Sequence, residues 1–226
     1  MATIDASKAG YIIGQASATF ATSWQDGSSV VYGPTTNQPI AISYTATSGR
    51  GSLTHAMRRT FLYFDTSGLT GTISNASLNI EGVTNHTADV IVLKSTAFGG
   101  DGGTALATSD FFSTIDFSTA YSSEYDWVVG TNDIDLNSTA NTDIQNDDAF
   151  ICAIVEHDKD YSNTAATSAT SRQNGIAFGT TITLTYTEAA ASGPANLTSF
   201  NSIAKASITS INGITMANIT TLNGIS

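Results

Sequence analysis

The sequence predicts an all-β protein, an antiparallel β-sandwich followed by a short tail of β-hairpin-like repeats. Three observations predict this class. Apolar and polar residues alternate over many short runs, whereas helical periodicity is nearly absent. Clusters of Gly, Asn, Asp and Ser separate these runs. Hydrophobic residues make up 41% of the chain, enough for a core, and charged residues only 12%.

Individual strands follow from this alternation. In "TTITLTYTE", Ile182, Leu184 and Tyr186 face one side of a sheet and the intervening threonines face the other. "NASLNIEG" repeats the pattern, while "ADVIVLKS" and "FICAIVEHD" are apolar on both faces, as in central strands. Turn signals such as "TSGLTGT", "FGGDGG", "QNDD" and "SRQNG" stand between them. We therefore expect a jelly roll with no helical blocks between its strands.

The composition changes after Glu188. "AAASGPA" contains small residues and a Gly-Pro breaker. A phrase of eleven residues then occurs three times, the third copy with ten of them: "ANLTSFNSIAK", "ASITSINGITM" and "ANITTLNGIS". We therefore divide the chain into a sandwich domain over residues 1–188, a linker over 189–194 and a repeat tail over 195–226.

The repeats predict hairpins. Asn212-Gly213 and Asn223-Gly224 stand between apolar residues, which is a strong type I′ turn signal. Folding the middle repeat about Asn212-Gly213 places Ile211 opposite Ile214, and Ile208 on the other face. Such hairpins are apolar on both sides and need a partner, either sister chains or another protein, although packing back on the sandwich is an alternative. The predicted assembly residues are Leu197, Phe200, Ile203, Ile208, Ile211, Ile214, Ile219, Leu222 and Ile225.

Charge and hydropathy exclude several partners. With a net charge of −11 and eight Lys and Arg, we expect no nucleic-acid partner. No apolar run reaches the roughly 18 residues of a membrane span, and an acidic surface is repelled by anionic bilayers. The N-terminus lacks the basic and apolar regions of a secretory signal. We expect synthesis in a cytoplasm without an export signal.

No catalytic constellation is evident, so we expect neither enzymatic activity nor a cofactor. A structural calcium ion has a candidate site in "EHDKDYSN", where Asp158, Asp160 and Asn163 alternate as oxygen ligands. "DIQNDD" is a second candidate, and both segments also fit solvated turns. Glycoside hydrolysis needs two carboxylates in one cleft, and Glu81, Glu124 and Glu156 are the candidates for such a pair.

Other residues have structural interpretations. Cys152, the one cysteine, lies in an apolar strand and is expected in the core. Either Arg58 or Arg59 is expected to pair with Asp65 or another carboxylate across the sheet. Trp24, Trp127, Tyr121, Tyr125 and Tyr161 fit a sandwich core or its rim, and alternatively a platform on which sugars stack.

The stretch "RRTFLYFDTSGLTGTISNASLNIEG" resembles the jelly-roll modules named after a DNRLR-type motif, which occur in bacterial surface proteins and phage virion proteins. The resemblance extends to "FICAIVEHD" as the penultimate strand and to the closing "ITLTY", and covers about residues 8–187. The chain has no literal "DNR" triplet. The tail is similar to the "SINGI…ANI" repeats that end structural proteins of marine phages.

These resemblances imply a non-enzymatic structural protein on the surface of a virion. We expect a capsid decoration or head fibre, anchored or trimerised by its repeats, with sister chains and a major capsid or other virion protein as partners. The alternative is a carbohydrate-binding adhesin module of a tail fibre, with a host surface glycan as partner. The two differ in that an adhesin needs an exposed aromatic or Asn/Asp-rich groove.

Overall fold

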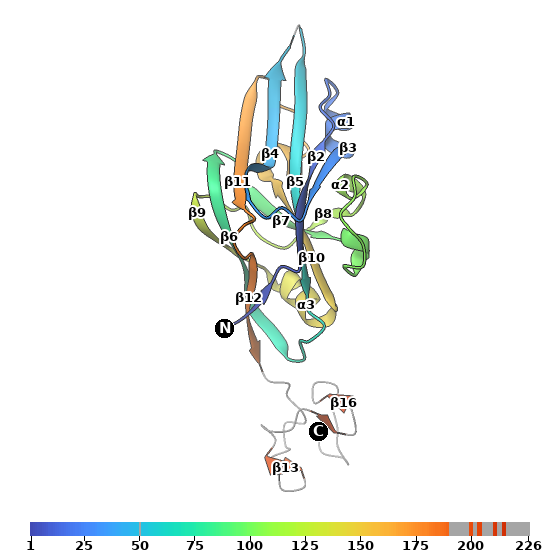
Figure 1. Cartoon of the computed structure of the whole chain (residues 1–226), viewed down its shortest axis with the longest axis vertical. Coiled ribbons are helices and arrows are strands. Elements are labelled where there is room, and N and C mark those ends of the chain that lie inside the picture. The colour runs from blue at the N-terminus through green and yellow to red at the C-terminus, as the bar shows by residue number, and fades with distance from the viewer. Residues whose placement is uncertain (50, 190–198, 201–202, 205–209, 212–213, 216–226) are drawn as a thin grey trace.

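The computed structural model describes residues 1–49 and 51–189 continuously, and four two-residue segments of the tail. Its fold is an antiparallel β-sandwich, as predicted (Figure 1). The first sheet has the order β4-β11-β6-β9, and the second has the order β5-β10-β7-β8. This order is that of a jelly roll, because the chain passes back and forth between two four-stranded sheets.

The eight jelly-roll strands are β4 (Asn37–Ser48), β5 (Leu53–Asp65), β6 (Thr72–His86), β7 (Val90–Ser95), β8 (Ile115–Ala120), β9 (Gly130–Asp135), β10 (Ala149–Glu156) and β11 (Thr170–Ala177). Four more strands extend the sheets: β1 (Ala2–Asp5), β2 (Lys8–Gly14), β3 (Gly27–Tyr32) and β12 (Thr183–Ala189). β12 pairs with β6 and β1, and β2 pairs with β5 and β3.

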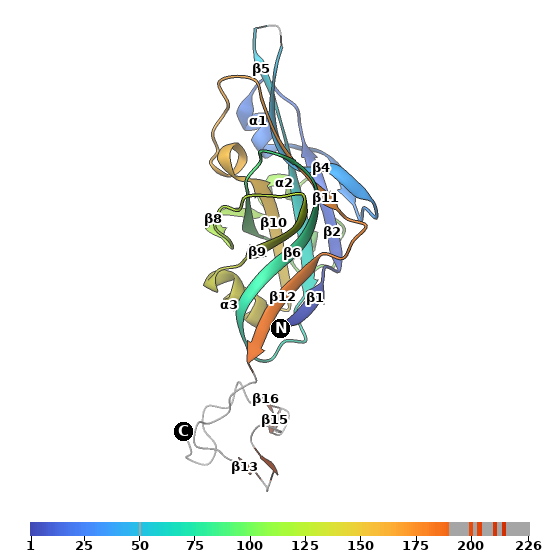
Figure 2. The same ribbon diagram turned by 90° about the vertical axis from the view of Figure 1, so that its left-hand side faces the viewer.

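The long strand β5 joins the two sheets. Its first half, from Leu53 to Arg58, pairs with β4 of the first sheet. Its second half, from Thr60 to Asp65, pairs with β10 of the second sheet. The sheets therefore diverge along β5, as the side view shows (Figure 2).

β7 and β10 of the second sheet are buried on both faces, which confirms the interpretation of "FICAIVEHD" and "ADVIVLKS" as central strands. Along β10, Phe150, Cys152 and Ile154 enter a first core between the two sheets. The alternate residues Ile151, Ala153 and Val155 enter a second core on the outer face of the second sheet. The second core lies beneath α1 (Phe20–Gln25), α2 (Asp110–Ser113) and β8.

Single-face alternation is also confirmed. Ile182, Leu184 and Tyr186 are buried in the first core, and the threonines between them are not. The same is true of Ala76, Leu78 and Ile80 in β6. Cys152 is completely buried, as expected.

Two expectations were wrong. "SRQNG" is not a turn but part of β11, which lies between β4 and β6, so "FICAIVEHD" is not the penultimate strand. The chain also contains helices, of which α3 (Ser138–Asn146) is the longest of the described part; the others include the turns Phe98–Gly100 and His157–Tyr161, called η1 and η2. The Asn137 side chain caps α3 by accepting from the amides of Thr139 and Ala140.

Candidate functional site

Two tail repeats form the same small hairpin. In the first, β13 (Ser199–Phe200) pairs with β14 (Ile203–Ala204); in the second, β15 (Ser210–Ile211) pairs with β16 (Ile214–Thr215). Ile211 lies opposite Ile214, as predicted, while the predicted turn residues Asn212 and Gly213 lie outside the described residues. Phe200 and Ile203 pair in the same way eleven residues earlier. The remaining predicted assembly residues lie outside the described residues: Leu197, Ile208, Ile219, Leu222 and Ile225.

The described tail strands pair with one another and not with strands of the sandwich. β12 ends at Ala189, one residue beyond the boundary drawn from the sequence. The end of β12 is tied down by Glu188, whose Oε1 accepts from the amides of Thr70 and Gly71 at 2.9 and 2.7 Å. The last described residue of the sandwich domain therefore has a fixed position at one end of it (Figure 1).

A cleft of about 680 Å³ lies where β5, β7, β10 and the end of α3 meet. Its carboxylates are Asp65, Asp101, Asp143, Asp147 and Asp148, and its cation is Lys94. Three of these carboxylates, Asp143, Asp147 and Asp148, come from "DIQNDD". Asp143 Oδ2 accepts from Lys94 Nζ at 2.8 Å and from the Tyr121 hydroxyl at 2.5 Å, and so holds together one wall of the cleft.

The cleft brings carboxylates together, but Asp65 does not have the properties of a general acid. Hydrogen bonds from the Ser67 hydroxyl and amide hold the pKa of Asp65 below its ordinary value. A glycosidase acid needs a raised pKa. The three glutamates considered from the sequence lie elsewhere: Glu81 on β6, Glu124 beside His157, and Glu156 at the end of β10.

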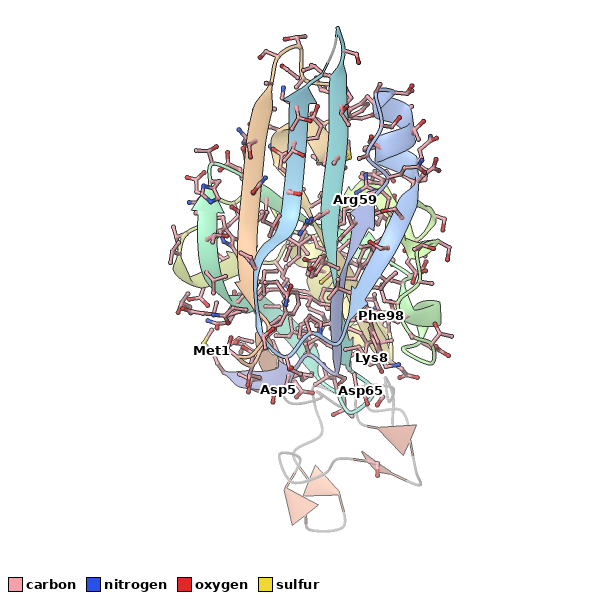
Figure 3. All side chains as sticks on the ribbon, turned by 45° about the horizontal axis from the view of Figure 1, so that its top comes forward. Met1, Asp5, Lys8, Arg59, Asp65 and Phe98 are labelled. Atoms are coloured by element: carbon pink, nitrogen blue, oxygen red, sulfur yellow. The ribbon has the colours of Figure 1, made fainter. Side chains whose placement is uncertain are left out.

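Arg59 is fully buried and pairs with Asp160, a different carboxylate from Asp65. Its Nε and Nη2 donate to the two carboxylate oxygens at 2.9 and 2.6 Å, and both side chains have no exposed surface. Arg58 instead donates to the carbonyl of Ile40 at 2.7 Å. Figure 3 places Arg59 midway along the sandwich, while Asp65 lies toward the end from which the tail leaves.

The calcium candidates are engaged by other groups. Asp160 gives both oxygens to Arg59, and Asp158 Oδ2 lies 2.6 Å from Arg172 Nη2. Asn163 adopts a left-handed backbone, with φ of 51°, just after the η2 turn. A calcium ion at these three residues would therefore have to displace both arginines.

A different trio could hold a metal ion. The oxygens Glu124 Oε1 and Asp158 Oδ1 lie 3.1 and 3.2 Å from Nδ1 of His157. The same distances fit ordinary contacts between the imidazole N–H and two carboxylates. We therefore assign these contacts to the surface ion network in which Arg172 pairs with Asp89 and Asp158.

The aromatic residues divide between core and rim. Trp127 and Tyr121 are buried in the first core, which confirms the structural interpretation for them. Trp24, Tyr125 and Tyr161 are half-buried. Trp24 packs against two rings that the sequence analysis did not single out, Phe112 at 4.7 Å and Phe117 at 5.0 Å between ring centroids. The signal for them was the repeated aromatic pattern in "DFFSTIDF".

Comparison with known proteins does not assign the chain to a family. No model of a known protein family matches the chain, and neither does any curated protein. Within residues 1–49 and 51–189, the helices are all too short to cross a bilayer, the longest having nine residues.

Proposed function

We propose that this protein is a non-enzymatic structural protein of a phage particle, a capsid decoration or head fibre that is held in place by its C-terminal repeats. The observation that carries the proposal is the repeated pairing: β13 pairs with β14 and β15 pairs with β16 in the same register, eleven residues apart. Isolated two-stranded hairpins are at best marginally stable in water. A chain that repeats one therefore needs a surface that stabilises it.

The sandwich suits display. It buries two apolar cores of its own, so its stability does not depend on the tail. The net charge of −11 favours a soluble, well-separated head domain. The repeats provide the apolar surface, and sister chains around a three-fold axis, or a capsid protein, are the partners that the resemblance of the tail implies.

The test is the solution mass by light scattering. The full chain is compared with a chain that stops after Ala189, which keeps all pairs of β12, and with the full chain carrying Ile211→Ser and Ile214→Ser. We expect an oligomer, a trimer in the simplest case, that becomes a monomer in both variants. Thr181→Ser, an exposed change on the sandwich, is the matched control. The same number of subunits in all four proteins would contradict an assembly role for the tail.

A further inference from the structure

A shallow groove lies between the end of α1 and the helix α2. Its volume is about 430 Å³. One wall is formed by Gln15, Gln25, Asp26 and Gly27, and the other by Thr108, Ser109, Phe112 and Ser113. The groove therefore combines one aromatic ring, on which a ligand can stack, with a rim of hydrogen-bonding side chains.

The aromatic ring of the groove is held in place by two others. Phe112 is half-buried, and its centroid lies 4.7 Å from that of Trp24 and 5.7 Å from that of Phe117. Trp24 is itself fixed, because its Nε1 donates to the carbonyl of Asp160 at 2.9 Å. Since its neighbours restrict it, Phe112 presents its ring to a ligand at little cost in side-chain entropy.

The rim carries polar groups without intramolecular partners. The side chains of Gln15, Gln25 and Asp26 are exposed, and within the described chain they make no hydrogen bond. The backbone beneath two of them is fixed, because the amide of Gln15 donates to the carbonyl of Asp26 at 2.7 Å. Two amides and a carboxylate together offer both donors and acceptors.

The buried Arg59 joins both walls of the groove to the sheet. Its Nη2 donates to the carbonyl of Trp24 at 2.9 Å, at the end of α1, and its Nη1 donates to the carbonyl of Phe111 at 2.5 Å, in α2. The guanidinium also lies over the Phe111 ring, 4.1 Å from its centroid. A buried ion pair adds little stability over an apolar replacement. The specific effect of Arg59 is that its hydrogen bonds fix the positions of α1 and α2.

Gly27 lets the walls approach each other. A Cβ atom at this position would lie 2.9 Å from Cβ of Phe111, closer than such atoms come in proteins. The first residue of β3 can therefore pack against α2 only as glycine. The close approach of the two walls is a consequence of this contact.

We propose that this groove binds one pyranose residue of a glycan. The C–H face of the sugar ring stacks on Phe112, and its hydroxyls exchange hydrogen bonds with Gln15, Gln25 and Asp26. Asp26 is the one charged residue among those lining the groove, and the chain carries a net charge of −11, so phosphorylated ligands are disfavoured. This function is additional to attachment and uses no residue of the tail.

The test is a titration of the full-length protein, followed by NMR amide shifts and saturation transfer. The probes are the methyl glycosides of glucose, galactose, mannose and N-acetylglucosamine. We expect at least one to bind with a Kd in the millimolar range and to perturb residues 25–27 and 108–113. Because one ring contact and one hydrogen-bonding side chain are lost, Phe112→Ala and Gln25→Ala should each weaken binding about 10-fold. Phe112→Trp should keep the affinity.

Two controls separate this site from the rest of the protein. Tyr32→Ala removes an aromatic side chain that is 44% exposed but lies outside the groove, and should bind like the unsubstituted protein. The Ile211→Ser and Ile214→Ser variant should also keep its affinity, so failure of the attachment proposal leaves this one intact. Failure of all four glycosides to bind, unchanged affinity in Phe112→Ala, or shifts confined to the acidic cleft would each overturn the proposal.

Discussion

At the scale of single residues, Arg59 has the most unusual environment. Its guanidinium has no exposed surface and contacts a carboxylate, two backbone carbonyls and the ring of Phe111. A charge in such a place is tolerated because Nε, Nη1 and Nη2 all donate to protein oxygens, which replace the hydrogen bonds that water would make. Asp160 supplies the opposite charge, so the two residues depend on each other.

Asp160→Asn should therefore destabilise the protein strongly. It removes the negative charge and leaves the Arg59 guanidinium buried and unpaired, a change that typically costs about 3–5 kcal/mol. The measurement is the free energy of unfolding from urea denaturation. Asp158→Asn, on the same turn but with a side chain 40% exposed, is the control and should cost about 0–1 kcal/mol. Similar losses in the two variants would mean that burial of the pair does not decide the outcome.

At the scale of elements, the junction of β10 and η2 depends on Glu156. The strand ends there, and the Glu156 carboxylate accepts from the amides of Asp158, Lys159 and Asp160 and from Arg172 Nε. The residue is nevertheless completely buried, and burial raises its pKa above the ordinary value, against the effect of these hydrogen bonds. Burial therefore raises the pKa of Glu156, while the hydrogen bonds that it accepts lower it.

This opposition predicts a pH dependence with a definite sign. Because the pKa of Glu156 is higher in the folded than in the unfolded protein, the folded state binds the proton more tightly. The resulting stabilisation is fully present below the unfolded pKa and is lost as the pH rises through the folded one. As the pH rises from about 4 through the folded pKa of Glu156, the unfolding free energy of the unsubstituted protein should therefore fall relative to that of Glu156→Gln.

Asp65→Asn is the control for the pH series, because the pKa of Asp65 is lowered and the sign is reversed. Relative to this variant, the unsubstituted protein should lose stability as the pH falls through the folded pKa of Asp65. A difference between Glu156→Gln and the unsubstituted protein that is constant with pH would show that the titration of Glu156 is not coupled to folding.

At the scale of the whole molecule, the second sheet lies between two cores. Buried side chains extend from both of its faces, so opening either core exposes β10. Many of the pairs are between strands far apart in the chain, as between β1 and β12 or β2 and β5. A fold of this kind is expected to fold slowly and to open as a unit.

Cys152 lies on β10 in the first core and reports this opening. Burial raises the pKa of its thiol, so in the folded state it is both inaccessible and protonated. We expect a thiol reagent to label it only through unfolded molecules, with a rate that follows global unfolding measured by urea titration. An exposed cysteine, introduced by Ser48→Cys, should react at once. Rapid labelling of Cys152 under native conditions would reveal a local opening of β10.

Some features could not be predicted because their causes lie outside the segment concerned. β11 contains "SRQNG", which is typical of turns. It lies between β4 and β6, however, and its backbone forms hydrogen bonds with both strands. α3 is made of poor helix formers, and it is stabilised by the Asn137 cap and by burial of Ala140 and Ile144. In both cases tertiary contacts outweigh the local preference.

The sequence by itself determined what depends on local pattern. Period-two alternation assigned the buried faces of β6 and β12, a continuous apolar run marked β10 as a central strand, and Asn212-Gly213 marked a hairpin turn whose pairing is found. Only the tertiary structure decided which distant residues meet. Arg59 and Asp160 are 101 positions apart, and the groove joins residues 15–27 to residues 108–113. No local pattern encodes such contacts, because they depend on how the strands are ordered in the sheets.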